Sequence, residues 1–348
     1  MTDRPLTVLM SFPPPLPTSN PYNSLLMDSV AALPNTKVLT FSWRRALFGK
    51  YDLFHVHWPE ILVTGHSWWK QLVRQALFVV LLIRLRLLRR PLVRTFHNLE
   101  LPQGISPLQT ALLRWAERWT TFWIVINTTT ELPANRPHAV ALHGHYRDWY
   151  SRYPSLEATP GRFGFFGGVR RYKNAVGLVR ALRQCDDPAL SLRICGRPSS
   201  QALADELRDA AGDDPRIELV LQFIDDPALV AHATSSELVV LPYPEMHNSG
   251  SVFAALSLDR PVLVPDNEVN RRLATEVGQQ WVIRYQGELS SAHLLSALAA
   301  VREIPAGSRP DLSQRDWPLI AGQHLAAYLK ALALAHRAAA GPDAAADV

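Results

Sequence analysis

The sequence predicts two α/β domains in series, each a doubly wound parallel sheet covered by helices. The chain has 348 residues, more than one hydrophobic core usually serves, and 47% of them are hydrophobic, which is enough for two cores. Short apolar runs alternate with longer stretches of helical periodicity along the chain. This alternation is typical of parallel strands joined by helices.

The predicted strands form two groups. In the first half they are Leu6–Met10, Val38–Phe41, Leu53–His57, Leu92–Phe96, Trp123–Ile126 and Ala139–Leu142. In the second half they are Phe163–Phe166, Leu190–Cys195, Ile217–Leu221, Leu238–Leu241 and Pro261–Val264. The two groups define a first domain over residues 1–150 and a second over residues 162–318. Residues 151–161 are the expected linker, because serine, threonine, proline and glycine break both periodicities there.

Charge and cysteine content exclude several classes of protein. Residues 1–150 carry 16 Lys and Arg against 8 Asp and Glu, whereas the remainder carries 20 against 23, so the basic surplus belongs to the first half. The two cysteines, Cys185 and Cys195, form neither a disulfide framework nor a zinc pattern, which fits a reducing cytoplasm. We expect no secretory signal, no bilayer-spanning segment, and a disordered tail over residues 338–348.

Residues that follow the predicted strands are the candidates for chemistry. Parallel α/β sheets bind ligands in the crevice outside the carboxyl ends of their strands. In the first domain this rule selects Asn20–Tyr22, Trp58, Glu60, His97, Asn98, Asn127–Thr130, His143 and His145. In the second domain it selects Gly167–Lys173, Gly196, Tyr243–Gly250 and Asp266.

The segment Phe165–Lys173 predicts a diphosphate site. A strand runs into Gly167 and Gly168, and the basic residues Arg170 and Lys173 follow at the start of a helix. Glycines permit close backbone approach, helix amides favour anions, and the two cations can neutralise a leaving phosphate. An ordinary turn with solvated arginines is an equally good interpretation. The segment lacks the ending of a Walker A loop and the full spacing of a dinucleotide motif.

A second phosphate turn is predicted between the strand before Tyr243 and the next helix. Ser249, the Gly250 amide and Ser251 can donate hydrogen bonds to phosphate oxygens, and His247 could hold a sugar hydroxyl or the phosphate. Helix capping by either serine is the alternative interpretation.

The segment His55–Glu60 places two histidines on one face of a strand and a carboxylate just beyond its end. A metal site is disfavoured, because nothing completes a metal-ligand signature and buried histidines bonded to their surroundings are commoner. Glu60 could take a proton from a hydroxyl nucleophile, although a surface or helix-capping role fits equally well. The chain contains no Asp-x-Asp triplet, so metal-bridged diphosphate chemistry is not indicated.

The segment from Ile61 to Leu99 has no acidic residue, and it has seven basic ones around a Leu-rich helix with Trp68 and Trp69. A basic amphipathic helix with tryptophans is typical of proteins that lie on an anionic membrane surface. Residues 68–94 are therefore the predicted membrane contact. A core helix with an arginine-rich outer face is the alternative. Nucleic acid is not expected as a partner, because no nucleic-acid motif accompanies the charge.

Several motifs together resemble a known family. The Gly-x-x-Arg-x-x-Lys turn and the Pro-Tyr and Ser-Gly turn resemble those of GT-B glycosyltransferases, whose two Rossmann-like domains face a central cleft. Longer segments resemble the xanthan-type GDP-mannose:glycolipid 4-β-D-mannosyltransferases, namely Asn20–Tyr22, His57–Glu60, Leu142–Trp149, Met246–Gly250 and Pro310–Pro318. The likeness runs from about Val8 to Leu329.

The resemblance implies transfer of mannose from GDP-mannose, with inversion, to a polyprenyl-diphosphate-linked oligosaccharide during exopolysaccharide assembly. It implies a cytoplasmic enzyme at the inner face of the cell membrane that needs no metal or other cofactor. The expected donor-binding residues are Gly168, Arg170, Lys173, Gly196, Tyr243, His247, Asn248, Ser249 and Gly250. The expected acceptor or cleft residues are Asn20, Tyr22, His57, Trp58, Asn98, His145 and Arg147. The final helix, residues 319–337, is expected to pack back on the first domain.

Inversion by one displacement needs a general base for the acceptor hydroxyl. Glu60 is the first candidate, and His97 and Asp148 are the reserves. One departure is that His247 and Ala255 stand where many retaining GT-B enzymes carry a Glu-x7-Glu pair, so the usual ribose-binding glutamate is absent. Two alternatives stay open: a different nucleotide-sugar donor or acceptor, or a non-catalytic GT-B partner that binds lipid-linked glycan.

Overall fold

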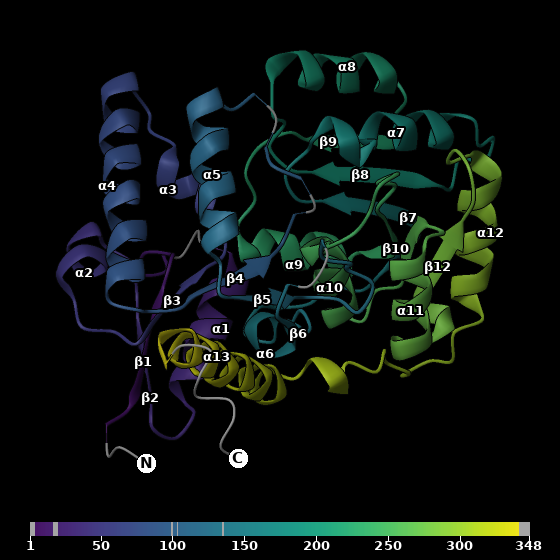
Figure 1. The fold of residues 1–348 in the computed structure, drawn as a ribbon. Helices are drawn as coiled ribbons and strands as arrows, with labels where there is room; N and C mark the ends of the chain where they lie inside the picture. The colour runs from purple at the N-terminus through teal and green to yellow at the C-terminus, as the bar shows by residue number, and fades with distance from the viewer. Residues whose placement is uncertain (1–3, 17–19, 99, 103, 134–135, 341–348) are drawn as a thin grey trace. The chain divides into compact units, whose positions relative to one another are not determined.

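The structure is a computed structural model that describes residues 4–16, 20–98, 100–102, 104–133 and 136–340 (Figure 1). The chain divides into two compact units. The first unit comprises Met1–Gly144 and Arg315–Val348, and the second comprises His145–Gln314. Each unit contains one six-stranded sheet whose strands pair in parallel, so the predicted α/β class is confirmed.

The sheet of the first unit has the strand order β2-β1-β3-β4-β5-β6. Its strands are β1 (Leu6–Met10), β2 (Thr36–Leu39), β3 (Leu53–Val56), β4 (Leu92–Phe96), β5 (Phe122–Val125) and β6 (His138–Val140). Its helices are α1 (Pro21–Ala31), α2 (Trp43–Phe48), α3 (Pro59–Val63), α4 (Trp68–Leu87), α5 (Pro107–Trp119) and α13 (Trp317–Ala340). Helices α2 to α5 pack together in one layer, and α1 and α13 pack against each other in a second layer.

Local sequence signals explain where two of these helices begin. Asn20 caps α1, with its Oδ1 accepting a hydrogen bond from the Tyr22 amide at 3.0 Å, and Pro21 occupies the first helical position. Ser106 and Gln109 form a capping box at the start of α5. On one face of the sheet, Phe54 and its neighbours pack against the buried side of α4.

The opposite face of this sheet meets α13 through a buried polar contact. Nδ1 of His55 lies 2.8 Å from the hydroxyl of Tyr328, and Nε2 of His55 lies 2.7 Å from Oγ1 of Thr95 on β4. All three side chains are fully buried. One helix residue is therefore joined by hydrogen bonds to two adjacent strands.

The sheet of the second unit has the strand order β12-β11-β10-β7-β8-β9. Its strands are β7 (Thr159–Phe166), β8 (Ser191–Cys195), β9 (Ile217–Val220), β10 (Ser236–Val240), β11 (Val262–Pro265) and β12 (Val282–Tyr285). Its helices are α6 (Arg147–Tyr150), α7 (Ala175–Arg183), α8 (Gln201–Ala211), α9 (Asp226–Thr234), α10 (Gly250–Ser257), α11 (Glu268–Val277) and α12 (Ser291–Arg302). Short 3-10 turns occur at Arg171–Lys173, at Gln279–Trp281 and at Ser313–Arg315, where the chain passes from the second unit back to the first.

The observed strands lie within a few residues of the predicted ones, with one addition. Strand β12 is missing from the predicted set, because it has four residues and Arg284 interrupts its apolar run. The segment expected to be a linker, 151–161, belongs to the second unit. Within it, the Leu156 amide donates to Oγ1 of Thr234 at 2.9 Å, and β7 already starts at Thr159.

The C-terminal segment differs from its expected bounds at both ends. The helix expected over residues 319–337 is α13, which is longer and belongs to the first unit. Residues 338–340 of the expected disordered tail continue this helix. The remainder, residues 341–348, lies outside the described residues.

Substitution of Tyr328 should destabilise the first unit strongly. We expect Tyr328→Ala to lower the free energy of unfolding by about 3–5 kcal/mol, because it empties a fully buried aromatic site. Tyr328→Phe should cost about 1–3 kcal/mol, because it leaves Nδ1 of His55 buried without its partner. Urea unfolding followed by circular dichroism measures both. Leu329→Ala on the exposed side of the same helix should change stability by less than about 0.5 kcal/mol, and equal losses for Leu329→Ala and Tyr328→Ala would contradict this packing.

Candidate functional site

Two histidines stand together at the carboxyl ends of neighbouring strands in the first unit. His57 follows β3 and His97 follows β4, and these strands pair in parallel. Nδ1 of His57 lies 3.0 Å from Nε2 of His97, so the two rings share a hydrogen bond. Trp58 stacks on the ring of His97, with ring centroids 4.2 Å apart and an interplanar angle of 15°. The stacking and the hydrogen bond together fix the orientation of His97.

Tyr22 joins this cluster from the start of α1. Its ring packs against the rings of His57, His97, His143 and Trp317. Its side chain is buried, and its hydroxyl has no hydrogen-bond partner among the described residues. Within the same described part of the chain, Nε2 of His57 is also buried without a partner. The cluster therefore holds a hydroxyl and a ring nitrogen that can bond to a ligand.

Burial keeps the clustered histidines neutral at pH 7. It lowers the pKa of His57 to about 3 and the pKa of His143 to about 4. It also lowers the pKa of His97 well below its usual range, and the neighbouring histidines add to this effect. Nδ1 of His143 donates to the carbonyl of Gly144 at 2.8 Å, which leaves the basic lone pair on Nε2. Each of these rings therefore stays neutral, and a ring nitrogen that carries no proton can accept a hydrogen bond.

Glu60 lies in the first turn of α3, shortly after β3, with its side chain half-buried. Burial raises the pKa of its carboxyl, and the Arg94 guanidinium opposes part of that rise. A carboxylate with a raised pKa is a better proton acceptor than a fully solvated one. Of the other predicted residues, Asn20 serves as the cap of α1, and Asn98 is exposed just beyond β4.

His55 is held by the structure on both ring nitrogens, as described above. This is the bonded, buried histidine that the sequence analysis weighed against a metal ligand. Over the residues that the structure describes, no group of three or more His, Cys, Asp or Glu side chains could hold a metal ion.

His145, Arg147 and Asp148 belong to the second unit, although they were expected within the first domain. Arg147 donates to the carboxylate of Asp259 at 3.2 Å and to the carbonyl of Pro310 at 2.8 Å. Its amide donates to Nδ1 of His145 at 3.2 Å. Asp148 is exposed on α6. The contacts of Arg147 are structural ones within the second unit.

The predicted diphosphate turn ends β7 in the second unit. Gly167 there and Gly196 after β8 have φ values of 100° and 156°. A Cβ atom on Gly196 would lie 1.9 Å from the carbonyl oxygen of Gly167. Only glycine therefore allows these two strand ends to approach each other, and it leaves the backbone open to a ligand.

Two cations flank this turn. Nζ of Lys173 lies 4.9 Å from the ring centroid of Tyr243, and burial, aided by Arg170, lowers the pKa of Lys173 to about 8. Arg170 donates to the carbonyl of Val169 at 3.1 Å, which holds its guanidinium close to the turn. A bound anion would interact with both positive charges.

Helix α10 starts beside the same turn. A Cβ atom on Gly167 would lie 3.3 Å from Oγ of Ser251 and 3.6 Å from Nζ of Lys173, so these groups converge. Ser249 occupies the N-cap position of α10, yet its side chain makes no capping hydrogen bond. The capping interpretation therefore does not explain Ser249. The positive end of the helix dipole and the charge of Lys173 both attract an anion to this turn.

A cavity of about 500 Å³ adjoins the glycine turn. Its walls include Gly168, Arg170, Gly196, Pro198, Phe223 and Ile224. Phe223 is 58% exposed and offers an apolar face for a flat ring. The volume lies within the range of about 300–1,000 Å³ typical of small-molecule sites. His247 and Asn248, half-buried in the loop before α10, are the remaining predicted donor residues, and burial lowers the pKa of His247.

Trp317 and Phe223 are missing from the predicted site residues. Trp317 begins α13, and a Cβ atom on Gly144 would lie 2.6 Å from its indole, so Gly144 and Trp317 fit each other closely. The conspicuous segment Pro310–Pro318 contains this tryptophan and could have marked it. Phe223 follows β9, where the rule on strand ends also applies.

Helix α4 exposes a continuous apolar surface, here called the α4 stripe. Its inner side chains, such as Phe78 and Leu81, are buried in the core. Its outer face exposes Trp68, Trp69, Leu72, Val73, Val80, Ile83 and Leu87. Large apolar side chains exposed together along one helix are typical of an interaction surface. No described helix is both long enough and apolar enough to cross a membrane.

The basic residues of segment 68–94 fall into two groups. Arg74 donates to the carbonyl of Thr64 at 2.6 Å. Arg84 and Arg90 both donate to the carbonyl of Gly49, at 2.7 and 3.1 Å. Arg94 is buried. Lys70, Arg86 and Arg89 are exposed. The outer face of α4 is therefore mainly apolar, and Arg86 is the exposed arginine within this helix.

Comparison with known proteins agrees with this picture. No family model matches the chain. The chain is 44% identical over 329 residues to the GDP-mannose:glycolipid 4-β-D-mannosyltransferase of Xanthomonas campestris pv. campestris, which covers 94% of this chain and 93% of that protein. The protein of that name from a second strain of the same organism gives the same identity and coverage.

Solved structures show the same fold at low sequence identity. The chain matches Alr3699/HepE of Anabaena in complex with UDP and glucose with a TM-score of 0.58 and 17% identity, covering 96% of this chain and 98% of that one. It matches the catalytic domain of starch synthase IV from Arabidopsis thaliana with a TM-score of 0.60 and 9% identity, covering 95% and 100%. The resemblance drawn from the motifs is confirmed: the chain is a glycosyltransferase with the GT-B fold, and it belongs to the family of GDP-mannose:glycolipid 4-β-D-mannosyltransferases.

Proposed function

We propose that the chain transfers mannose from GDP-mannose to a polyprenyl-diphosphate-linked oligosaccharide, with inversion at the sugar, in exopolysaccharide biosynthesis. The observation that carries the proposal is the convergence of the glycine turn, Lys173 and the start of α10 beside a cavity of nucleoside size. The curated relatives named for this reaction span nearly the whole chain. A non-catalytic partner would have no need for this set of anion-binding groups.

In the proposed reaction an acceptor hydroxyl attacks C1 of mannose. The bond between C1 and the β-phosphate oxygen breaks, and its electron pair leaves with GDP. Arg170 and Lys173, together with the amides at the start of α10, neutralise the charge that develops on the leaving diphosphate. These groups supply positive charge at the place where other enzymes use a divalent cation, so we propose that the transfer is metal-independent.

The nucleoside of the donor is assigned to the cavity beside the glycine turn. The base would lie against Phe223 and Ile224, and the diphosphate would lie on the turn near Gly168. His247 and Asn248 stand close in sequence to the start of α10 and are the proposed contacts to sugar hydroxyls.

The acceptor is assigned to the histidine cluster of the first unit. The hydroxyl of Tyr22 and Nε2 of His57 can bond to sugar hydroxyls, and the indole of Trp58 offers an aromatic face to a sugar ring. Glu60 remains the first candidate for the general base, because its carboxyl is half-buried and has a raised pKa. His97 is the alternative, since it is neutral and oriented by two neighbours, and Asp148 is the third candidate.

The α4 stripe is assigned to the inner face of the cell membrane, where a lipid-linked acceptor resides. Apolar side chains would enter the interface, and the exposed cations Lys70, Arg86 and Arg89 would attract anionic headgroups. The chain would then be a cytoplasmic protein that associates peripherally with that membrane.

Removal of the Lys173 charge should weaken donor binding. Lys173→Ala should reduce the affinity for GDP by about tenfold to a hundredfold, because a charge-assisted hydrogen bond to phosphate is lost. Thermal shift and calorimetry with GDP, UDP, ADP and GDP-mannose, with and without EDTA, measure this. Lys330→Ala on the exposed side of α13 is the control. A selective response to UDP would indicate a UDP-sugar as the donor. No response of the wild-type protein to any nucleotide would favour a non-catalytic partner.

Removal of the base should abolish transfer and leave donor binding intact. We expect Glu60→Gln to lower kcat by about a hundredfold or more, with an unchanged thermal shift for GDP, because general base catalysis is lost. Transfer of radiolabelled mannose to lipid-linked acceptor measures the rate. Glu131→Gln, an exposed carboxylate of the same unit, is the matched control. Full activity of Glu60→Gln would move the role to His97, which His97→Asn tests in the same assay.

Polar substitution of the α4 stripe should release the protein from vesicles. The triple variant Leu72→Gln, Val80→Gln and Leu87→Gln should weaken binding to phosphatidylcholine and phosphatidylglycerol vesicles by at least about tenfold, because each side chain loses on the order of 1 kcal/mol of apolar burial. The control replaces three exposed leucines elsewhere, Leu295, Leu319 and Leu329, by Gln. Equal sedimentation of the two triple variants would remove the stripe as the membrane contact.

A further inference from the structure

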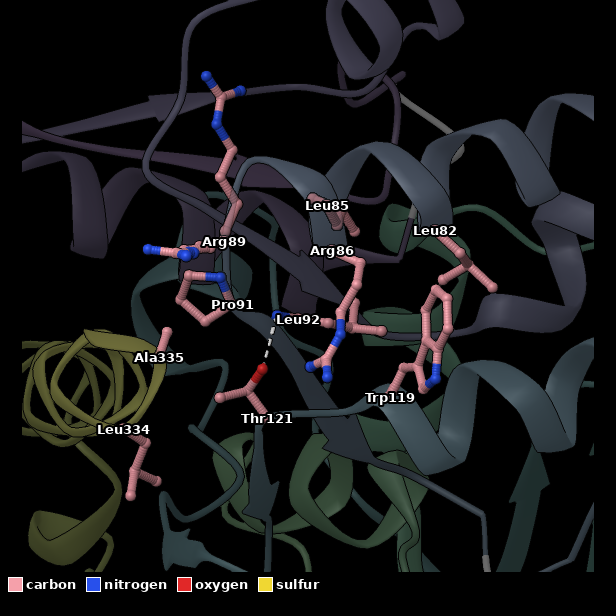
Figure 2. Close-up of a pocket in the computed structure, with 11 residues that line it drawn as sticks. Leu82, Leu85, Arg86, Arg89, Pro91, Leu92, Trp119, Thr121, Leu334 and Ala335 are labelled. Carbon is pink, nitrogen blue, oxygen red and sulfur yellow. Dashed lines mark hydrogen bonds between the residues drawn. The ribbon is translucent and has the colours of Figure 1, made fainter. Parts of the chain in front are cut away.

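A second cavity lies in the first unit, at the amino end of the sheet. It has a volume of about 270 Å³, and its walls include Leu82, Leu85, Arg86, Arg89, Arg90 and Trp119 (Figure 2). Leu334 and Ala335 of α13 close its other side. Because Leu92 begins β4, this cavity is at the opposite end of that strand from His97.

The lining combines three cations with apolar walls and contains no acidic residue. Arg90 already donates to the carbonyl of Gly49 at 3.1 Å and lies 4.5 Å from the ring centroid of Tyr51. Arg86 lies 6.0 Å from the ring centroid of Trp119, and Figure 2 shows its guanidinium between Trp119 and Thr121. Among the described residues, neither Arg86 nor Arg89 has an ion-pair partner.

The backbone at Arg89 supports a role for its side chain. Arg89 follows the C-cap of α4 and has a φ of 52°, the left-handed conformation that favours glycine or asparagine at this position. One cation near a helix C-terminus is explained by the helix dipole. Arg90 is accounted for by Gly49 and Tyr51, but the helix dipole does not explain why both Arg86 and Arg89 line the same cavity.

The cavity is continuous with the α4 stripe along the chain. Ile83, Leu87 and Leu88 are exposed in the last turns of the same helix whose inner residues Leu82 and Leu85 line the cavity. Arginines at the end of an apolar membrane-facing helix stand at the level of lipid headgroups.

We propose that this cavity binds the phosphate of an anionic glycerophospholipid, with the start of an acyl chain lying against Leu82 and Leu334. The guanidinium of Arg86 bonds to the phosphate diester, and Arg89 supplies a second positive charge at the rim of the same cavity. The proposal rests on the membrane association proposed above. The cavity is smaller than the range of about 300–1,000 Å³ that serves drug-sized ligands, which suits a headgroup better than a nucleotide.

The position of the cavity argues against the reacting sugar of the acceptor as its occupant. Strand β4 has five residues, so at about 3.3 Å per residue its two ends are roughly 13–17 Å apart. The sugar that reacts must reach the carboxyl end, where His57 and His97 stand. A membrane lipid bound at the amino end would instead hold the unit at a fixed depth and orientation.

Calorimetric titration of the full chain with dihexanoylphosphatidylglycerol, kept below its micelle concentration, tests the assignment. We expect one saturable site. The double variant Arg86→Gln and Arg89→Gln should weaken binding at least about tenfold, because the charge-assisted contact of Arg86 and the second positive charge of Arg89 are both lost. Ala335→Trp, which fills the cavity without a change in charge, should weaken it as well. Lys37→Gln with Arg44→Gln removes two exposed charges of the same unit and should leave the affinity within about twofold.

Several results would overturn the proposal. Equal affinity of the Arg86 and Arg89 double variant, equally tight binding of inorganic phosphate, or no saturable binding would each remove the lipid site. Tighter, arginine-dependent binding of farnesyl diphosphate would assign the cavity to the lipid diphosphate of the acceptor. The α4 stripe variant should still bind the monomeric lipid, and every variant should keep its thermal shift with GDP. Failure of the membrane association and failure of the transferase proposal can therefore be told apart from failure of the lipid site.

Discussion

The first unit depends on the buried hydrogen bonds of His55. One ring nitrogen meets Tyr328 of α13 and the other meets Thr95 of β4, so a helix from the far end of the sequence is joined to two adjacent strands. Those strands lead directly to His57 and His97. Because the same packing excludes water from the neighbouring rings, their pKa values are lowered and they stay neutral. The contact that completes the fold of this unit also sets the protonation state of its candidate site.

The second unit depends on a steric constraint instead of a hydrogen bond. Gly196 approaches Gly167 so closely that a Cβ atom on Gly196 would lie 1.9 Å from the carbonyl oxygen of Gly167. This approach brings the ends of β7 and β8 together at the carboxyl edge of the sheet, where Lys173 and the start of α10 also lie. The lysine is half-buried and its pKa is lowered to about 8, so an anion that binds there stabilises its charged form. The two units thus carry different chemical groups, each at the carboxyl edge of its own parallel sheet.

The sequence predicts the strands well, and it places Gly167 at the end of β7 and Gly250 at the start of α10, because apolar runs and glycine positions are local signals. It predicts partners over long separations poorly. Arg84 and Arg90 read as surface charge, yet both donate to the carbonyl of Gly49, which no local pattern indicates. Arg147 likewise forms its bonds with Asp259 and Pro310 within the second unit, although its position in the sequence suggested the first. Strand β12 was too short to stand out against the polar residues around it.

Helix α4 exposes an apolar face to its surroundings, which its composition alone did not predict. Its composition suggested a basic outer face, but most of its arginines turn toward carbonyl groups or collect at its last turn, and the outward side chains are apolar. A helix that is apolar all round is normally buried on all sides. Here only one side meets the core, so the other side needs a second apolar environment. The exposed cations Lys70, Arg86 and Arg89 favour an environment that carries anions at its boundary. The anionic bilayer surface that we propose as the contact of this helix has both properties, whereas a protein partner would need an apolar groove with acidic residues along its edge.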